Sequence, residues 1–287
     1  MWIVFSFASA LTESVKNIVV KHNTKTFNPL VISWAWFSYS LIILLPVMFV
    51  KGIPDLDGTF WFALVSRTIL DVIAAVLYTN SIKRTDVSFN IPMLAFTPLF
   101  LLFSGLIINK EFPNFLGLLG VTAIILGAYL LNFKKNETIY QPFLAIVKNQ
   151  GTMMMLGVAV IWGLTGSLHK LAILHSDPYF YAGFGSLVLA LTLTPLAATA
   201  NKNDFYNALK IKNISKLSPV GILNGVSVLT QMIGQSLTLA VFVISVKRTS
   251  IIFSAILAWL VFKEPIKYRI FPIILMVTGI ILISLSS

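Results

Sequence analysis

The chain has 287 residues, of which 57% are hydrophobic and 11% are charged, whereas an ordinary soluble domain has about 45–50% and about 25%. With a mean hydropathy of +0.89, it has too few charges to cover the surface of a soluble globule, which excludes a cytosolic enzyme. It contains no cysteine, which excludes disulfides, thiolate metal sites and cysteine nucleophiles.

Apolar segments separated by short polar clusters indicate an all-α integral membrane protein. A span takes roughly 20 apolar residues, so ten spans leave only short loops and no room for a soluble domain. In chain order we predict spans at 2–21, 29–50, 59–82, 88–108, 113–133, 152–173, 179–199, 218–240, 243–262 and 269–286. The first lacks the basic leader of a signal peptide, so we expect a retained helix. The run from Val220 to Phe262 is too long for one span, so we expect it to fold back near Ala240.

The two halves of the sequence share an ordered set of matches, which indicates a duplication. The matched positions are Leu11-Thr12-Glu13-Ser14 with Leu164-Thr165-Gly166-Ser167, His22 with His175, Pro29 with Pro178, Pro46 with Pro195, and Lys110-Glu111 with Lys263-Glu264. We therefore expect a first five-helix repeat at 1–135, a connecting loop at 136–151 and a second five-helix repeat at 152–287. Because five is odd, the second repeat would be inverted in the membrane, an arrangement typical of secondary transporters with a midplane site.

These features resemble the EamA family of the drug/metabolite transporter superfamily. The resemblance rests on the five-helix halves, on the Lys-Glu pairs that close the fourth and ninth spans, on Gly117, Gly120, Gly127 and Gly279 in the spans that follow, and on residues 246–254. It covers nearly the whole chain and implies a ten-helix fold around a central cavity that opens alternately to each side. The superfamily moves amino acids, nucleotide sugars, phosphorylated sugars, choline-like cations and drugs, so the resemblance does not identify the substrate.

The net charge of +11 is foremost a topological signal. Basic residues prefer cytoplasmic loops, and they flank the spans instead of forming one face, which disfavours nucleic-acid binding. One side carries Lys21, Lys25, Lys83, Arg84, Lys134, Lys135, Lys148, Lys202, Lys210, Lys212, Lys216, Lys263, Lys267 and Arg269, and the other carries Lys51 and Lys110. We expect an integral protein of the cell (inner) membrane with both termini outside the cytoplasm, although relatives are usually drawn with both termini inside.

Charged groups inside predicted spans are costly and mark candidate site residues. Glu13 and Lys16 lie three apart, and Arg67 and Asp71 lie four apart, so each pair can alternatively neutralise itself. The alternative for Lys170, and for the adjacent Lys247 and Arg248, is snorkelling to the headgroups, and for His169 it is hydrogen-bonded packing. Cations outnumber carboxylates in this set, which favours a carboxylate, phosphate or zwitterion over an organic cation.

Neutral polar and aromatic residues complete the predicted site. Gln231 and Gln235 lie one turn apart, although bonding between helices would explain them equally well. Asn17 follows Lys16, and Tyr78 belongs to a candidate aromatic wall with Trp34, Trp36, Tyr39 and Trp162. The predicted substrate site therefore comprises Glu13, Lys16, Asn17, Arg67, Asp71, Tyr78, His169, Lys170, Gln231, Gln235, Lys247 and Arg248, with Glu13 also as the proton-coupling group.

The leading functional hypothesis is a secondary-active transporter of a small anionic or zwitterionic metabolite that works by alternating access. The sequence lacks a GxxxxGK[ST] loop, so we expect coupling to a proton or to exchange instead of ATP hydrolysis. The alternatives are a non-transporting structural or partner subunit and an integral-membrane enzyme, for which His22, His169 and His175 offer no metal-ligand spacing. We expect no catalytic residue, metal or cofactor. The expected partners are the lipid bilayer and a small solute, with the chain as a monomer or homodimer.

Overall fold

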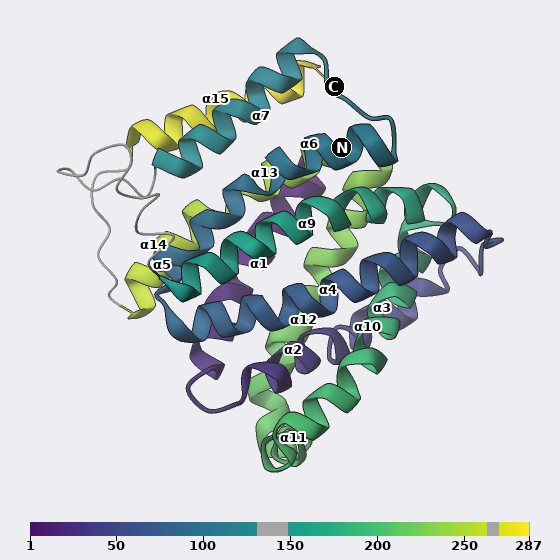
Figure 1. The fold of residues 1–287 in the computed structure, drawn as a ribbon, viewed down its shortest axis with the longest axis vertical. Helices are drawn as coiled ribbons and strands as arrows, with labels where there is room; N and C mark the ends of the chain where they lie inside the picture. The colour runs from purple at the N-terminus through teal and green to yellow at the C-terminus, as the bar shows by residue number, and fades with distance from the viewer. Residues whose placement is uncertain (131–148, 263–269, 287) are drawn as a thin grey trace.

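The computed structural model describes residues 1–130, 149–262 and 270–286, and every secondary-structure element in that part of the chain is a helix (Figure 1). In the first half these are α1 (Trp2–Asn23), α2 (Pro29–Ser38), α3 (Leu41–Met48), α4 (Gly58–Arg84), α5 (Val87–Asn90), the 3-10 helix η1 (Ile91–Phe96), α6 (Thr97–Ile108) and α7 (Phe115–Leu130). In the second half they are α9 (Gln150–Leu174), α10 (Pro178–Ala200), α11 (Lys202–Ala208), α12 (Ile211–Leu237), α13 (Ala240–Lys247), α14 (Ser250–Phe262) and α15 (Ile270–Ser286).

Short polar side chains determine where several of these helices begin. Asp57 accepts a hydrogen bond from the backbone amide of Phe60 at 2.8 Å, and Asp177 accepts one from that of Tyr179 at 2.8 Å. Asn149 caps α9 in the same way. Such caps satisfy amide groups that have no partner inside the helix, so each apolar segment starts at a defined residue.

Seven helical segments of the described chain are long and apolar enough to cross a membrane. They are Trp2–Asn23, Pro29–Met48, Gly58–Arg84, Gln150–Leu174, Pro178–Ala200, Ile211–Leu237 and Ala240–Val261, and the shorter apolar helices are Met93–Ile108, Phe115–Leu130 and Phe271–Ser286. The all-helical architecture is therefore confirmed in the described residues, with seven candidate membrane spans, while the count of ten spans and the repeat boundaries stay predictions. The reversal expected near Ala240 occurs between Leu237 and Ala240, where α12 ends and α13 begins.

Three of the segments predicted as single helices are interrupted. The segment 29–50 breaks at Tyr39 and Ser40, where a Cβ added to Gly221 of α12 would lie 2.4 Å from Tyr39. The segment 88–108 passes through η1 before α6 starts at Thr97, and 243–262 breaks at Arg248 and Thr249 before α14 starts at Ser250. The offset that aligns Lys110-Glu111 with Lys263-Glu264 also aligns Thr97 with Ser250, so the fourth and ninth segments break at equivalent positions.

The contacts between the two halves keep their pattern when the halves are exchanged. Helix α4 packs along α9, and the equivalent pair is α12 along α1. Helix α7 packs along α15, its own counterpart, and α2 and α3 pack against α10. This pattern is the one that a pseudo-two-fold relation between the halves produces.

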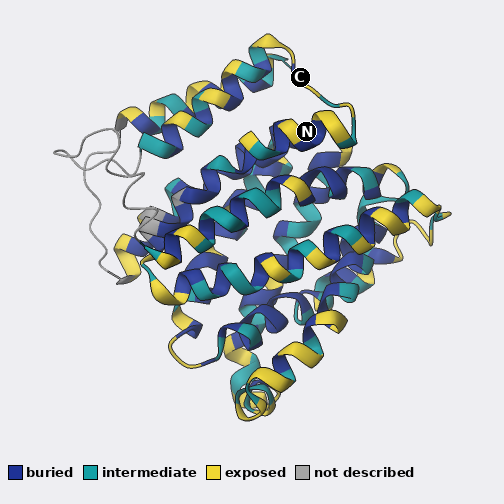
Figure 2. Cartoon of the chain, in the orientation of Figure 1, coloured by how far each residue is buried: buried dark blue, intermediate teal, exposed yellow. Residues whose placement is uncertain are grey.

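Glycines bring α7 and α15 into close contact, as the paired ribbons in Figure 1 show. A Cβ added to Gly120 would lie 2.6 Å from the carbonyl oxygen of Gly279, and one added to Gly279 would lie 2.6 Å from that of Gly120. Both helices also carry exposed apolar residues, among them Phe115 and Phe271, and both ribbons include exposed positions in Figure 2. Small residues between helices and apolar residues outside are typical of packing in a bilayer.

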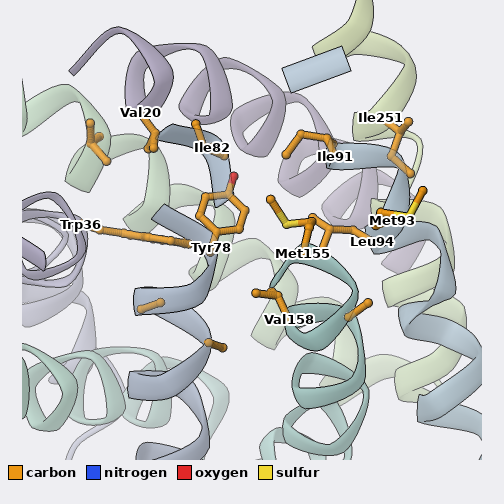
Figure 3. Packing of buried hydrophobic residues seen from close by; sticks show 14 of the residues in the cluster. Val20, Trp36, Tyr78, Ile82, Ile91, Met93, Leu94, Met155, Val158 and Ile251 are labelled. Atoms are coloured by element: carbon orange, nitrogen blue, oxygen red, sulfur yellow. The ribbon is translucent and has the colours of Figure 1, made fainter. Parts of the chain in front are cut away.

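The apolar core joins residues from both halves. In Figure 3, Trp36 of α2 lies beside Tyr78 of α4, and Met155 and Val158 of α9 lie near the η1 residue Leu94. All five side chains are buried. This core forms one wall behind the polar residues described next.

Candidate functional site

A cavity with about 750 Å³ of empty space, part of it at its mouth, lies among α1, α2, α4, α9, α10, α12 and α13. Its walls include eight of the twelve residues predicted for the substrate site. These are Glu13, Lys16, Arg67, Asp71, His169, Gln231, Lys247 and Arg248. The charged side chains among them are all less than 10% exposed, so the fold holds them inside the bundle instead of at its surface.

Glu13 lies at the centre of one charged cluster. Its Oε2 accepts a hydrogen bond from the ammonium of Lys16 at 2.8 Å and lies 3.5 Å from the ammonium of Lys247. Ser227 donates to the same oxygen at 3.3 Å, whereas Oε1 is buried without a hydrogen-bond partner. The predicted pair of Glu13 with Lys16 therefore exists, and a second cation from α13 joins it.

Arg248 follows Lys247 at the break between α13 and α14. Its guanidinium lies 5.6 Å from the centre of the Trp162 ring, a cation–π contact. Arg248 is 2% exposed, yet within the described residues its guanidinium makes no hydrogen bond or ion pair, and its Nε is buried without a partner. Lys247 is also buried and donates to Oε1 of Gln231 at 2.7 Å. Neither side chain snorkels, which answers the alternative that the sequence left open.

A second charged cluster contains Arg67, Asp71 and His169. Arg67 donates to Oδ2 of Asp71 at 2.7 Å, and Nε2 of His169 lies 3.7 Å from the same oxygen. The other ring nitrogen of His169 shares a hydrogen bond with the hydroxyl of Tyr181 at 2.7 Å. The pair of Arg67 with Asp71 is self-neutralising, as one alternative held, but it also lines the cavity.

Two of the five candidate wall aromatics line the cavity. The ammonium of Lys16 lies 3.7 Å from the centre of the Trp36 ring, and the Trp162 ring makes the cation–π contact with Arg248. Trp34 instead donates to Thr194 at 3.0 Å, and Tyr39 donates to the carbonyl oxygen of Ala208 at 3.1 Å. The aromatic wall is therefore smaller than predicted.

Four of the predicted substrate-site residues do not line the cavity. The hydroxyl of Tyr78 donates to Oδ1 of Asn17, whose amide donates to Ser254 at 2.9 Å, so both are used in packing beside Trp36. Lys170 donates to backbone oxygens at the end of α12, including that of Gln235. The amide oxygen and nitrogen of the Gln235 side chain are both buried without hydrogen bonds in the described structure. Backbone groups at a helix end bind Lys170, and side chains of other helices bind Tyr78 and Asn17, which the sequence pattern did not reveal.

The structure also adds residues that sequence reasoning missed. The polar ones are Thr165, Tyr181, Ser186 and Asn224. Asn224 receives a hydrogen bond from Lys16 at 3.4 Å, and its spacing of seven residues from Gln231 places both on one helix face, a signal that could have found it. Thr165 and Ser186 lack such a signal, because small hydroxyl side chains are common in membrane helices.

The comparisons with known proteins agree with this arrangement. A crystal structure of another protein covers 99% of this chain and 96% of its own chain, with a TM-score of 0.69 and 14% sequence identity, which shows a shared fold. No curated protein matches the sequence. The model of the EamA-like transporter family matches residues 1–133 and 149–285. The chain, an all-helical protein with membrane-spanning segments and a buried polar cavity, belongs to the EamA-like transporter family.

Proposed function

We propose that this protein is a secondary-active transporter that carries a small anionic or zwitterionic solute through the cavity by alternating access. The observation that supports the proposal most is Arg248, a buried cation without a hydrogen-bonded partner in the described chain. An isolated buried charge is unfavourable unless something compensates it. A solute with an oxyanion would do so through charge-assisted hydrogen bonds.

The arrangement of the halves supports alternating access. Exchangeable contacts between α4 and α9 and between α1 and α12 fit two repeats of opposite orientation, with the cavity where they meet. The charged lining residues are buried around a cavity that has a mouth, which fits a carrier that exposes these residues to one side at a time. In such a carrier, rocking of one repeat against the other exposes the same residues to each side in turn.

Glu13 is the proposed proton-coupling residue. Its Oε1 is buried without a hydrogen bond, and its Oε2 faces two lysines. A carboxylate between cations can change its charge or its partner when an anion enters. The proposal allows coupling by a proton or by exchange, and both use this central position.

Uptake by the purified chain in proteoliposomes tests the proposal. The probes are labelled succinate, glycerol 3-phosphate, lactate, alanine and choline, each with and without an imposed proton gradient. We expect saturable uptake of at least one anion or of the zwitterion above that of protein-free vesicles, with uptake reduced in Arg248→Gln. Absence of saturable uptake for every probe, or uptake of choline alone, would contradict the proposal.

A further inference from the structure

We infer that the solute is a dianion, an inference that rests on the proposed transport function and narrows its substrate class. Besides His169, which is counted as neutral, the lining contains four lysine and arginine side chains, Lys16, Arg67, Lys247 and Arg248, and two carboxylates, Glu13 and Asp71. The difference is two positive charges. A dianion is therefore the solute that makes the occupied cavity neutral.

The contacts show which cations lack compensation. Arg67 and Asp71 form their own ion pair at 2.7 Å. Glu13 lies between Lys16 and Lys247, at 2.8 and 3.5 Å, and one carboxylate neutralises only one of them. One lysine charge and the Arg248 guanidinium therefore remain for a ligand.

The surroundings make this imbalance significant. Besides the charged groups and a few neutral polar side chains, the walls contain the aromatic side chains of Trp36 and Trp162 and the apolar side chains of Val228, Met232 and Ile244. Charges interact strongly where water is scarce and the local dielectric is low. A monoanion would leave one cation without compensation, and a zwitterion would leave two.

A zwitterion also lacks a suitable place for its ammonium group. Within the described part of the chain, the buried carboxylate oxygen that has no hydrogen bond is Oε1 of Glu13. An ammonium bound there would lie beside Lys16 and Lys247, which already approach the other oxygen. Like charges at that distance repel. In contrast, Arg248 can bind a carboxylate or phosphate with two parallel hydrogen bonds, and Lys247 comes from the same break in the ninth segment.

The experiment measures counterflow in proteoliposomes with glycerol 3-phosphate and succinate as dianions, lactate as monoanion and alanine as zwitterion. We expect the chain to prefer at least one dianion, and the two dianions distinguish one phosphate from two separated carboxylates. Arg248→Gln lowers the net charge of the cavity lining from two positive charges to one. It should therefore weaken dianion binding by at least about tenfold and shift the preference toward lactate. Lys51→Gln, an exposed charge change outside the cavity, is the matched control.

The outcomes separate this inference from the proposed function. Uptake of lactate or alanine without uptake of either dianion would overturn the inference and leave transport standing. Uptake of none of the probes would contradict the transport proposal itself. If Arg248→Gln does not fold, Lys247→Gln removes the neighbouring charge and must shift the preference in the same direction.

A different observation supports a second inference, about how the ends of the bundle close. The ammonium of Lys170 donates to the carbonyl oxygens of Gln235 at 2.6 Å and Thr238 at 3.0 Å, at the end of α12. That ammonium also lies 3.5 Å from Glu111. These contacts, which we name the Lys170 clamp, tie α9 to α12, and both helices line the cavity.

An equivalent Lys21 clamp exists in the other half. Lys21 donates to the carbonyl oxygens of Ile82 at 2.9 Å and Thr85 at 2.8 Å, at the end of α4. The offset that aligns Lys110-Glu111 with Lys263-Glu264 pairs Ile82 with Gln235 and Thr85 with Thr238. Lys21 itself lies one turn beyond Asn17, the position equivalent to Lys170. Two lysines from non-equivalent positions thus hold equivalent carbonyl pairs.

The two clamps lie at opposite ends of the bundle. Helices α1 and α12 run antiparallel, because Ser6 lies near Gly234 and Asn23 donates to the carbonyl oxygen of Lys216. The end of α12 is therefore beside the start of α1, whereas Lys21 is near the end of α1. The geometry points to the two clamps as gating contacts: the lysine–carbonyl hydrogen bonds at one end of the bundle break when the cavity opens at that end.

Because the sequence contains no cysteine, a Ser186→Cys variant carries a single thiol, which lines the cavity. Labelling of this thiol, read out in the purified protein, measures how easily a reagent enters the cavity. We expect Lys170→Gln to increase its labelling by a membrane-impermeant thiol reagent from one face, tested in intact cells and inverted vesicles. Lys21→Gln should increase labelling from the opposite face. The matched controls are Lys170→Arg and Lys21→Arg, which keep the donors and should keep low labelling.

Labelling that is unchanged in both glutamine variants, or increased from the same face in both, would overturn the assignment. Exposed Lys83→Gln controls for loss of a basic charge near the end of α4. A glutamine variant that loses its fold would label equally from both faces, and that result would also contradict the gating assignment.

Discussion

Replacing Glu13 by glutamine should destabilise the folded protein strongly, because the change removes a charge from the centre of a buried cluster. Glu13 is 2% exposed, and its Oε2 contacts Lys16 at 2.8 Å and lies 3.5 Å from Lys247. Glutamine has nearly the same shape and retains hydrogen-bonding atoms. The variant therefore isolates the effect of charge from the effect of packing.

The expected loss follows from the number of cations left behind. Removing one partner of a buried ion pair costs about 3–5 kcal/mol, and here the loss leaves Lys16 and Lys247 facing each other with Arg248 nearby. We expect a decrease in the free energy of unfolding in that range. The loss should be smaller when Lys247→Met is added, because the second change removes one uncompensated cation.

Unfolding by titration with sodium dodecyl sulfate in mixed micelles at neutral pH measures these differences. The set comprises the unmodified protein, Glu13→Gln, Lys247→Met and the double variant, with Asp55→Asn as an exposed control. A decrease of less than about 1 kcal/mol in Glu13→Gln would refute the reasoning, since exposed ion pairs already give values of that size. A double variant that is no more stable than Glu13→Gln would refute the account of the leftover cations.

Three further predictions concern packing, capping and topology. Gly120→Ala should destabilise the protein by about 1–3 kcal/mol, because the added Cβ would lie 2.6 Å from the carbonyl oxygen of Gly279. Gly157→Ala is the control and should be tolerated, because its Cβ would lie 3.7 Å from the Leu77 side chain. Chemical or thermal unfolding compares the stability of the two variants. The hydrogen bond from the backbone amide of Phe60 holds the pKa of the Asp57 carboxyl below its usual range. The stabilisation that this cap gives to the fold is therefore present at neutral pH and is lost as the pH falls from roughly 3.9 through the lowered pKa. Asp57→Ala should reduce the melting temperature at pH 7 and not in strong acid. A reporter fused after residue 287 should be active outside the cytoplasm, and activity only inside would contradict the orientation inferred from the basic residues.

Much of the fold could be predicted from the sequence because hydropathy and length determine where apolar helices lie. The reversal between α12 and α13 was predictable from length alone, since no single span could contain the run. The breaks at Tyr39 and before Ser250 were not predictable from hydropathy, because each lies inside a stretch that is apolar enough over its whole length to be one span. Lys247 and Arg248 beside the second break were therefore interpreted as charges within a span. Packing against Gly221 accompanies the first break, and such tertiary contacts leave no local pattern.

The site was predicted less completely, for a physical reason that two lysines illustrate. Lys247 and Lys170 both appeared as cations inside apolar segments, and the sequence could not distinguish their surroundings. In the structure Lys247 meets Gln231 and Glu13 in the cavity, whereas Lys170 meets backbone oxygens at a helix end. A long side chain reaches whichever acceptor the neighbouring helix provides, so its role depends on tertiary packing.

The pairing of α7 with α15 has a consequence for how the chain is made. Each helix presents glycine backbone to the other, and they come from opposite halves of the sequence. During synthesis the glycine face of α7 lacks its partner until α15 has been made, and α1 likewise lacks α12. Contacts between distant segments form late and leave intermediates exposed. Neither half can therefore reach its final packing before α15 has been made, whereas the contact between α4 and α9 can form earlier.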